Sequence, residues 1–258
     1  MLKKYTLSSR ALVFPFLMLV GMWGGFLLQH LGVLTYCDGA IIPLSPEGLK
    51  GVLFSPFLHG NMEHLLSNTL PMAVLLFLLY QFYGTIAHRI LLYGWMAAGL
   101  LVWSFPPVDV GTGAFYYSCI VGASGLIYVL AFFLFFSGVF RWDVRLLAVT
   151  LVVGLYYGGL VWGVFPEEFF YRLDSPSRVS WQSHLSGAVV GVILAFLFRK
   201  SGAKRKKFIW EFPEYYSEKD DRLWQRYKEM HPDDFQELPQ KRKEGVWEHL
   251  EELRRKDG

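Results

Sequence analysis

The sequence predicts an all-α polytopic membrane protein with six transmembrane helices and a charged cytoplasmic C-terminal tail. Of the 258 residues, 53% are hydrophobic, and 30 of the 47 charged side chains lie in residues 199–258. The 17 charges of residues 1–198 are grouped, so that six gaps of at least 19 uncharged residues remain. A helix of about 18 apolar residues can cross the hydrocarbon core and satisfies its own backbone hydrogen bonds. This pattern excludes a water-soluble enzyme, a disulfide-built secreted domain and a nucleic-acid binder.

Each gap predicts one helix. The first apolar run follows Lys3, Lys4 and Arg10, as in a signal peptide. It is longer than a signal core of about 7 to 15 residues and no small-x-small cleavage site follows, so we interpret it as a retained anchor. Between an N-terminal segment, 1–10, and the tail, 199–258, helices are expected at 11–33, 61–83, 86–105, 118–139, 144–165 and 181–198.

The distribution of Lys and Arg predicts that both termini are cytoplasmic. This orientation places the cluster of six Lys and Arg at residues 199–207 inside, and it leaves only Lys50, Arg172 and Arg178 outside. The second, fourth and sixth helices then run from the outside to the inside, with their N-terminal ends together at the outer surface. A minimal six-helix plan of this kind indicates a bacterial plasma membrane.

Polar side chains inside membrane spans are costly and by default mark function. They gather near the outer ends of the three inward-running helices. At about 1.5 Å per residue, Ser124 is expected roughly 9 Å below Ser118, at a depth similar to that of His184 and Asn68. The polar and small residues are His59, His64 and Asn68 in the second helix, Gly122, Ser124 and Gly125 in the fourth, and His184, Gly187 and Gly191 in the sixth.

These residue types fit acyl transfer. A serine hydroxyl becomes a nucleophile when a base lies within hydrogen-bonding reach, and His184 is the only ionisable residue of the sixth helix. His64 and Asn68 are four residues apart, share a helix face and can donate hydrogen bonds to an oxyanion. No acidic residue is expected at this depth, so the sequence predicts a Ser124/His184 dyad. Its chemistry requires no cofactor and no metal.

Other residues of the same helices are expected to support this pair. Tyr128 lies one turn below Ser124 and is placed to stack on the imidazole of His184. Gly187 and Gly191 form a small-residue face on which the sixth helix can approach another backbone closely. Together with Gly122 and Gly125, this face would bring the serine and the histidine together.

Simpler interpretations remain open for several of these residues. Ser124 could be a small packing residue, and Asn68 could merely join helices by hydrogen bonds. His59 and His64 would point about 140° apart on one helix, which disfavours a metal site. Cys37 and Cys119 both fall on the outer side; unpaired cysteines are favoured, with a disulfide as the alternative.

The membrane part of the sequence resembles a rhomboid intramembrane serine protease. The resemblance covers residues 10–198 and rests on three motifs that occur in the expected order and helices. They are His59-x4-His64-x3-Asn68, Gly122-x-Ser124-Gly125-x2-Tyr128 and His184-x2-Gly187-x3-Gly191.

The resemblance implies an intramembrane serine endopeptidase. Ser124 would be the nucleophile and His184 the general base and acid, while His64, Asn68 and the Ser124 N–H would stabilise the oxyanion. Tyr128 would support the histidine, and His59 would be structural. The implied substrates are transmembrane proteins in the lipid bilayer, cut near small residues after lateral entry. Residues 166–180 would form a cap, and the fifth helix a gate.

One loop departs from the family pattern, and the tail lies outside the resemblance. Many members carry a Trp-Arg pair in the first loop, where this chain has Leu49-Lys50-Gly51. In the tail, residues 218–230 and 245–256 have helical spacing, and a solvated appendage is favoured over a regulatory module with an unidentified partner.

Two other functions remain to be distinguished from a protease. A catalytically silent relative would bind transmembrane segments in quality control or trafficking. A small-molecule transporter would place its polar residues near the bilayer midplane, whereas here they gather towards one face.

Overall fold

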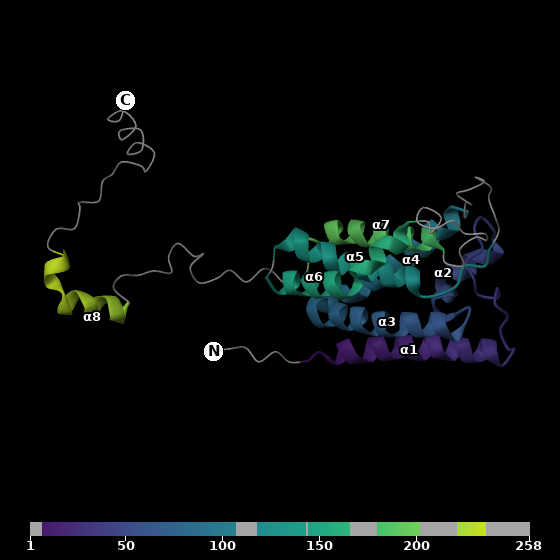
Figure 1. Ribbon diagram of the computed structural model, residues 1–258, viewed down its shortest axis with the longest axis horizontal. Helices are drawn as coiled ribbons and strands as arrows, with labels where there is room; N and C mark the ends of the chain where they lie inside the picture. Colours follow the sequence, from purple (N-terminus) through teal and green to yellow (C-terminus); the bar gives the residue numbers. More distant parts are fainter. Residues whose placement is uncertain (1–6, 107–117, 143, 166–179, 202–220, 236–258) are drawn as a thin grey trace, which may run out of the picture. The chain divides into compact units, whose positions relative to one another are not determined.

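The computed structural model describes residues 7–106, 118–142, 144–165, 180–201 and 221–235 (Figure 1). The chain divides into two compact units, Met1–Arg205 and Lys206–Gly258. The described residues form eight α-helices, joined by turns and short 3-10 helices. Seven of the α-helices belong to the first unit and one to the second.

Six long helices build the first unit, and each lies within or across one of the six predicted ranges. They are α1 (Ser9–His30), α3 (Met62–Tyr83), α4 (Ala87–Ser104), α5 (Ser124–Arg141), α6 (Val144–Tyr157) and α7 (Trp181–Leu197). The segment between α1 and α3 contains a 3-10 turn at Glu47–Lys50, the short helix α2 (Gly51–Phe54) and a second 3-10 turn at Ser55–Phe57.

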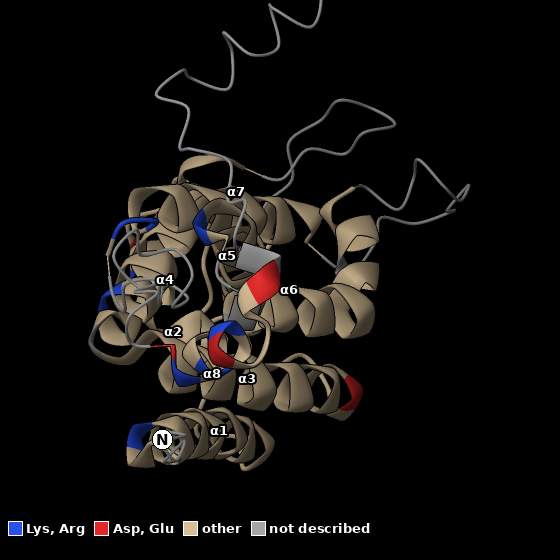
Figure 2. Cartoon of the chain, turned by 90° about the vertical axis from the view of Figure 1, so that its left-hand side faces the viewer, with Lys and Arg blue, Asp and Glu red and all other residues tan. Residues whose placement is uncertain are grey.

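Several of these helices are apolar enough for a membrane. By length and composition α1, α3 and α5 can each cross one, and two shorter apolar helices cover Leu146–Tyr157 and Trp181–Leu197. Figure 2 shows that charged residues are sparse along the helices of the first unit. The chain therefore has the character of a multi-pass membrane protein.

Helix α5 lies at the centre of the first unit. It packs against α3, α4, α6 and α7, and the residues from Gly125 to Ala131 are buried without interruption. A helix that is apolar all round belongs in a core. By contrast, α1 lies at the margin beside α3 (Figure 1) and exposes Leu12, Phe16 and Leu17, as expected of a surface that faces lipid.

The N-terminal end of α5 differs from the prediction. A helix was expected from residue 118, but α5 begins at Ser124. Ile120 instead exchanges two backbone hydrogen bonds of 2.9 Å with Ile41, and Gly122 has a φ of +115° and donates its N–H to the Ser55 carbonyl. Because these bonds hold the segment in a non-helical course, Ser124 lies at the start of the helix and not one and a half turns inside it.

The predicted range 144–165 is also not one continuous α-helix. Helix α6 ends at Tyr157, and the chain continues as a 3-10 helix, η4, over Gly158–Val164. Two successive glycines at this junction lower the preference for α-helix. The change of helix type matters for the site, because η4 contains Gly163.

The second unit contains one described α-helix, α8 (Arg222–Met230), followed by a 3-10 turn at Pro232–Phe235. The predicted helical run 218–230 covers α8. The predicted run 245–256 lies outside the described residues.

Candidate active site

Helices α5 and α7 approach each other closely through glycine. A Cβ atom added at Gly187 would collide with the backbone carbonyl of Gly125 and would lie 2.9 Å from the Tyr128 Cβ. One added at Gly191 would lie 2.6 Å from the Val129 carbonyl oxygen. The absence of side chains at these two positions therefore lets the two backbones touch, as small residues do between membrane helices.

This register places Gly125, which follows Ser124, against Ser183, which precedes His184. A Cβ at Gly125 would lie 2.7 Å from the Ser183 hydroxyl, so the neighbours of Ser124 and of His184 are in contact. In the described part of the chain, the Ser124 and His184 side chains do not form a hydrogen bond with each other. Catalytic hydrogen bonds are often long before substrate binds and shorten in the reactive complex.

The ring of His184 is held on two sides. His184 is 7% exposed, and its Nδ1 lies 2.9 Å from the Gly163 carbonyl oxygen. A carbonyl oxygen only accepts, so Nδ1 carries the proton and Nε2 of the neutral ring is an acceptor. The expected contact with Tyr128 is present: the two rings stack with centroids 4.2 Å apart and planes within 6°.

His64 lies against the backbone turn that precedes Ser124. A Cβ atom at Gly122 would lie 2.5 Å from Cε1 and 2.8 Å from Nε2 of His64. Gly122 also has a positive φ that disfavours other residues. The side chain of Asn61 accepts the His64 N–H at 2.8 Å and caps α3. This cap fixes the position of His64 in the first turn of the helix.

Asn68 lies one turn further along α3. It is 4% exposed, and among the described residues its Nδ2 has no hydrogen-bond partner. A buried amide donor without a partner is costly, which makes it available to a group that enters the site. Asn68 does not belong to the lining of the cavity described below, whereas His64 does.

The prediction that the two histidines of the first motif point about 140° apart on one helix is wrong. His59 precedes α3 and is not part of it, and its ring meets the ring of His64 edge to face with centroids 5.2 Å apart. His59 is 2% exposed, and its backbone N–H donates to the Gln29 side chain of α1. Among the described residues no group of three metal-ligating side chains comes together.

An open cavity of about 670 Å³ lies over the start of α5. Ser124 and His64 both contribute to its wall, and hydroxyl groups of other residues make much of the rest polar. The further polar side chains of the wall are Tyr36, Asn61, Glu63, Ser67, Ser118, Ser180 and Ser183. Ser124 is half-buried and borders this open cavity.

Comparison with known proteins agrees with these motifs. The rhomboid domain matches residues 46–201, which is more than half of the chain. The chain belongs to the rhomboid family. The predicted resemblance is thereby confirmed, and the helices of the site all lie inside the matched range.

The chain is similar to uncharacterized proteins of mycobacteria. The chain is 40% identical over 174 residues to uncharacterized proteins of Mycobacterium bovis and Mycobacterium tuberculosis, covering 64% of this chain and 65% of each relative. It is 34% identical over 178 residues to an uncharacterized protein of Mycobacterium leprae, covering 63% of this chain and 61% of the relative. The chain thus spans less than two thirds of the length of these relatives.

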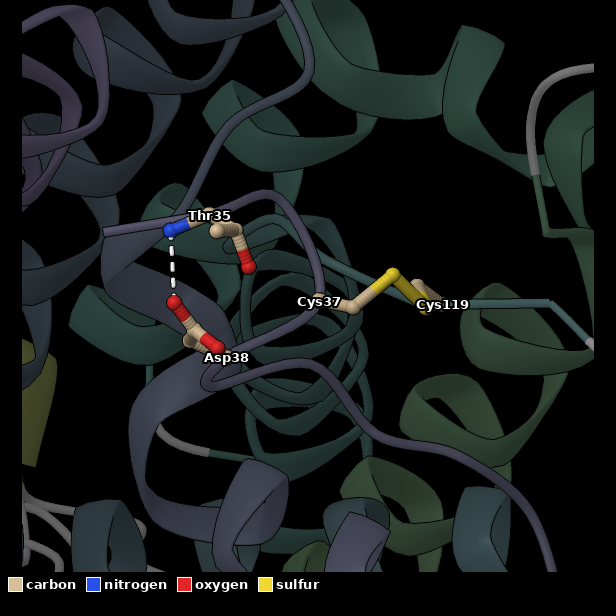
Figure 3. The surroundings of a disulfide bond; sticks show 4 residues. All are labelled: Thr35, Cys37, Asp38 and Cys119. Carbon is tan, nitrogen blue, oxygen red and sulfur yellow. Dashed lines mark hydrogen bonds between the residues drawn. A yellow bond between two sulfur atoms is a disulfide. The ribbon is translucent and has the colours of Figure 1, made fainter. Parts of the chain in front are cut away.

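A disulfide closes one side of the cavity in this rhomboid. Cys37 and Cys119 are bonded, with Cα atoms 5.4 Å apart (Figure 3), so the favoured prediction of unpaired cysteines is wrong. The bridge between Ile41 and Ile120 holds the two segments side by side and brings the sulfur atoms together.

The first cysteine lies in a tight turn beside the site. The Thr35 N–H donates to the Asp38 carboxylate at 2.6 Å (Figure 3). This hydrogen bond lowers the pKa of Asp38, because it favours the charged carboxylate. The turn and the disulfide together fix the segment that leads into the wall of the cavity.

Some contributors to the site were not found from the sequence. Gly163 supplies the carbonyl for His184, and Ser55 supplies the carbonyl for the Gly122 N–H. Asn61 caps α3, and an Asn before a helical run is a recognisable signal for this role. The predicted cap at 166–180 lies outside the described residues except for Ser180, which caps α7.

Proposed function

We propose that this rhomboid is an intramembrane serine endopeptidase that hydrolyses peptide bonds in or near the transmembrane segments of other membrane proteins. The observation that carries the proposal is the environment of His184. Its ring is held by Tyr128 and by the Gly163 carbonyl, and the residue before it, Ser183, contacts the residue after Ser124. A histidine with a fixed tautomer beside a serine on a neighbouring helix is what general-base activation requires.

The reaction follows from the two side chains. The Ser124 hydroxyl attacks the substrate carbonyl carbon while His184 Nε2 takes its proton, and a tetrahedral oxyanion forms. His184 then returns the proton to the leaving amine, which leaves an acyl group on Ser124. Water loses a proton to His184 and attacks the ester. His184 then gives this proton to the Ser124 oxygen as the acid leaves, so both side chains return to their starting state and no cofactor is consumed.

Three kinds of donor are placed to stabilise the oxyanion. Ser124 is the first residue of α5, where backbone N–H groups have no acceptor inside the helix and the helix dipole favours negative charge. His64 lies against Gly122 in the wall of the cavity, and Asn68 has an unpaired amide donor. Each such donor typically contributes about 100 to 1,000-fold in rate.

The dyad is favoured over a triad by the partner of His184. In a triad a buried carboxylate accepts from Nδ1 and orients the ring. Here the backbone carbonyl of Gly163 accepts that hydrogen bond, and stacking on Tyr128 fixes the plane of the ring. The Gly163 carbonyl thus fixes the tautomer of His184 and Tyr128 fixes its orientation, which are the two roles that a carboxylate has in a triad.

A fluorophosphonate probe tests this assignment. The Ser124 oxygen is expected to attack phosphorus with loss of fluoride, giving one adduct per chain on the peptide that contains Ser124. The adduct should disappear in His184→Ala and persist in Ser137→Ala, a buried serine further along α5. An adduct on another serine, or none on a folded protein, would overturn the assignment.

The proposed topology has six transmembrane helices with both termini in the cytoplasm of a bacterial plasma membrane. In this arrangement α4, α6 and α7 cross the membrane in addition to the three long helices α1, α3 and α5. Residues 1–10 and 199–258 then lie inside. A reporter enzyme that is active only outside the cytoplasm, fused after Gly258, is expected to remain inactive. An active fusion would refute this orientation.

The alternative is a catalytically silent rhomboid that binds transmembrane segments. It is favoured by one observation, that Ser124 and His184 do not share a hydrogen bond in the described structure. The contacts of His184 with the Tyr128 ring and the Gly163 carbonyl speak against it, because a binding protein does not require a histidine of fixed orientation.

A further inference from the structure

The tail contains a helix whose residues divide into two faces. Asp221 caps α8 (Arg222–Met230), since its side chain accepts the N–H groups of Leu223 and Trp224 at 3.1 and 3.0 Å. A capped first turn sets the start of the helix and therefore the direction of each side chain that follows.

One face of α8 is apolar and exposed. At 100° per residue, Leu223, Tyr227 and Met230 fall within a 60° sector, and Trp224 lies 60° beyond it on the side of Tyr227. Leu223 is 81% exposed, Met230 61% and Tyr227 41%. Large apolar side chains gathered on one exposed helix face indicate a binding surface.

The borders of this face are basic. Arg226 lies along one edge and Lys228 along the other, where its Nζ approaches the Trp224 ring to 5.8 Å. Gln225 and Glu229 occupy the side opposite the apolar residues. Cations that flank an apolar sector, with polar residues opposite, are the arrangement of helices that lie in a lipid interface.

Helix α8 lies close in the sequence to the membrane helix α7. Only 24 residues separate the end of α7 from the start of α8, and the first ten of them include the six Lys and Arg of residues 199–207. Such a cluster next to a transmembrane helix is attracted to anionic lipid. The bilayer that holds the first unit is therefore always within reach of the helix.

We propose that α8 binds in the headgroup region of an anionic lipid surface, with Leu223, Tyr227 and Met230 towards the acyl chains. Charge complementarity selects lipid as the occupant, since the cations Arg226 and Lys228 flank the apolar face, whereas the acidic Asp221 and Glu229 lie at the cap and on the opposite side. This inference does not depend on the protease activity of the first unit.

Site-directed spin labelling of the full chain in vesicles tests the proposal. Leu223→Cys places the label on the apolar face, and Glu229→Cys, in the same helix but 120° away, is the matched control. Because Cys37 and Cys119 are paired, the introduced thiol takes the label. The probes are oxygen, which concentrates in lipid, and a water-soluble nickel chelate, in vesicles of phosphatidylcholine with and without phosphatidylglycerol.

With phosphatidylglycerol, the Leu223→Cys label should gain oxygen accessibility and lose nickel accessibility, while the Glu229→Cys label stays accessible to nickel. Adding Arg222→Ser and Arg226→Ser should lower the ratio of lipid-bound to water-exposed label by about 5-fold per cation, with a similar loss in high salt. Equal nickel accessibility of both labels in anionic vesicles would overturn the proposal. So would protection of Leu223→Cys that is the same without anionic lipid, which would indicate packing on protein.

Discussion

Replacing Ser124 by Ala is expected to reduce the rate of transmembrane-substrate cleavage by about a million-fold, the loss typical when a serine protease loses its nucleophile. The variant keeps the small size that the start of α5 requires, because Ser124 borders the glycine contact between α5 and α7. Its oxyanion donors remain, but no acyl group can form. In liposomes, no product should appear above the rate without enzyme.

The control for this change is Ser137→Ala. Ser137 lies in the same helix and is fully buried. Its hydroxyl has no hydrogen-bond partner in the part of the chain that the structure describes, so its removal leaves no polar group unsatisfied there. Cleavage by this variant should match wild type. Unchanged cleavage by Ser124→Ala, measured beside it with equal amounts of folded protein, would contradict the assignment of the nucleophile.

Replacing Gly187 by Val is expected to abolish cleavage by a different route. The added Cβ would meet the Gly125 carbonyl, a backbone atom that cannot rotate away. Overpacking of this kind typically costs about 1–3 kcal/mol, and the relief available is separation of α5 from α7. Since Ser124 and His184 lie on these two helices, separation breaks the dyad, and fluorophosphonate labelling should be lost together with cleavage.

Gly24→Ala is the matched control for Gly187→Val. Gly24 is also a helical glycine, in α1, but an added Cβ meets nothing within 4 Å. Its replacement should leave labelling unchanged and raise the free energy of unfolding slightly, because Ala favours helix over Gly by about 1 kcal/mol. Full activity in Gly187→Val would show that the close contact is not needed to align the two residues.

The sequence predicts the long helices and the family because both depend on local patterns. The uncharged runs predict the bounds of four helices, α1, α3, α4 and α7, to within three residues. The spacing of the three motifs sets the family, and Tyr128 was correctly placed against His184 from helical periodicity alone.

What the sequence did not show depends on contacts between distant segments. The start of α5 is fixed by hydrogen bonds from Ile120 and Gly122 to residues of the first loop, and the same pairing brings Cys37 to Cys119. The Gly163 carbonyl reaches His184 only because α6 gives way to a 3-10 helix. No periodicity in one stretch of chain reveals such pairings, although the Gly158-Gly159 pair indicates that α6 ends there.

The most direct test of the central claim is mass spectrometry of a single-span substrate after incubation with the reconstituted full-length protein. We expect two products whose masses add up to substrate plus one water, from a cut in or near the transmembrane segment, and no such products with Ser124→Ala. Substrate that is recovered intact while bound to the folded wild-type protein would contradict the protease and indicate a silent, binding rhomboid.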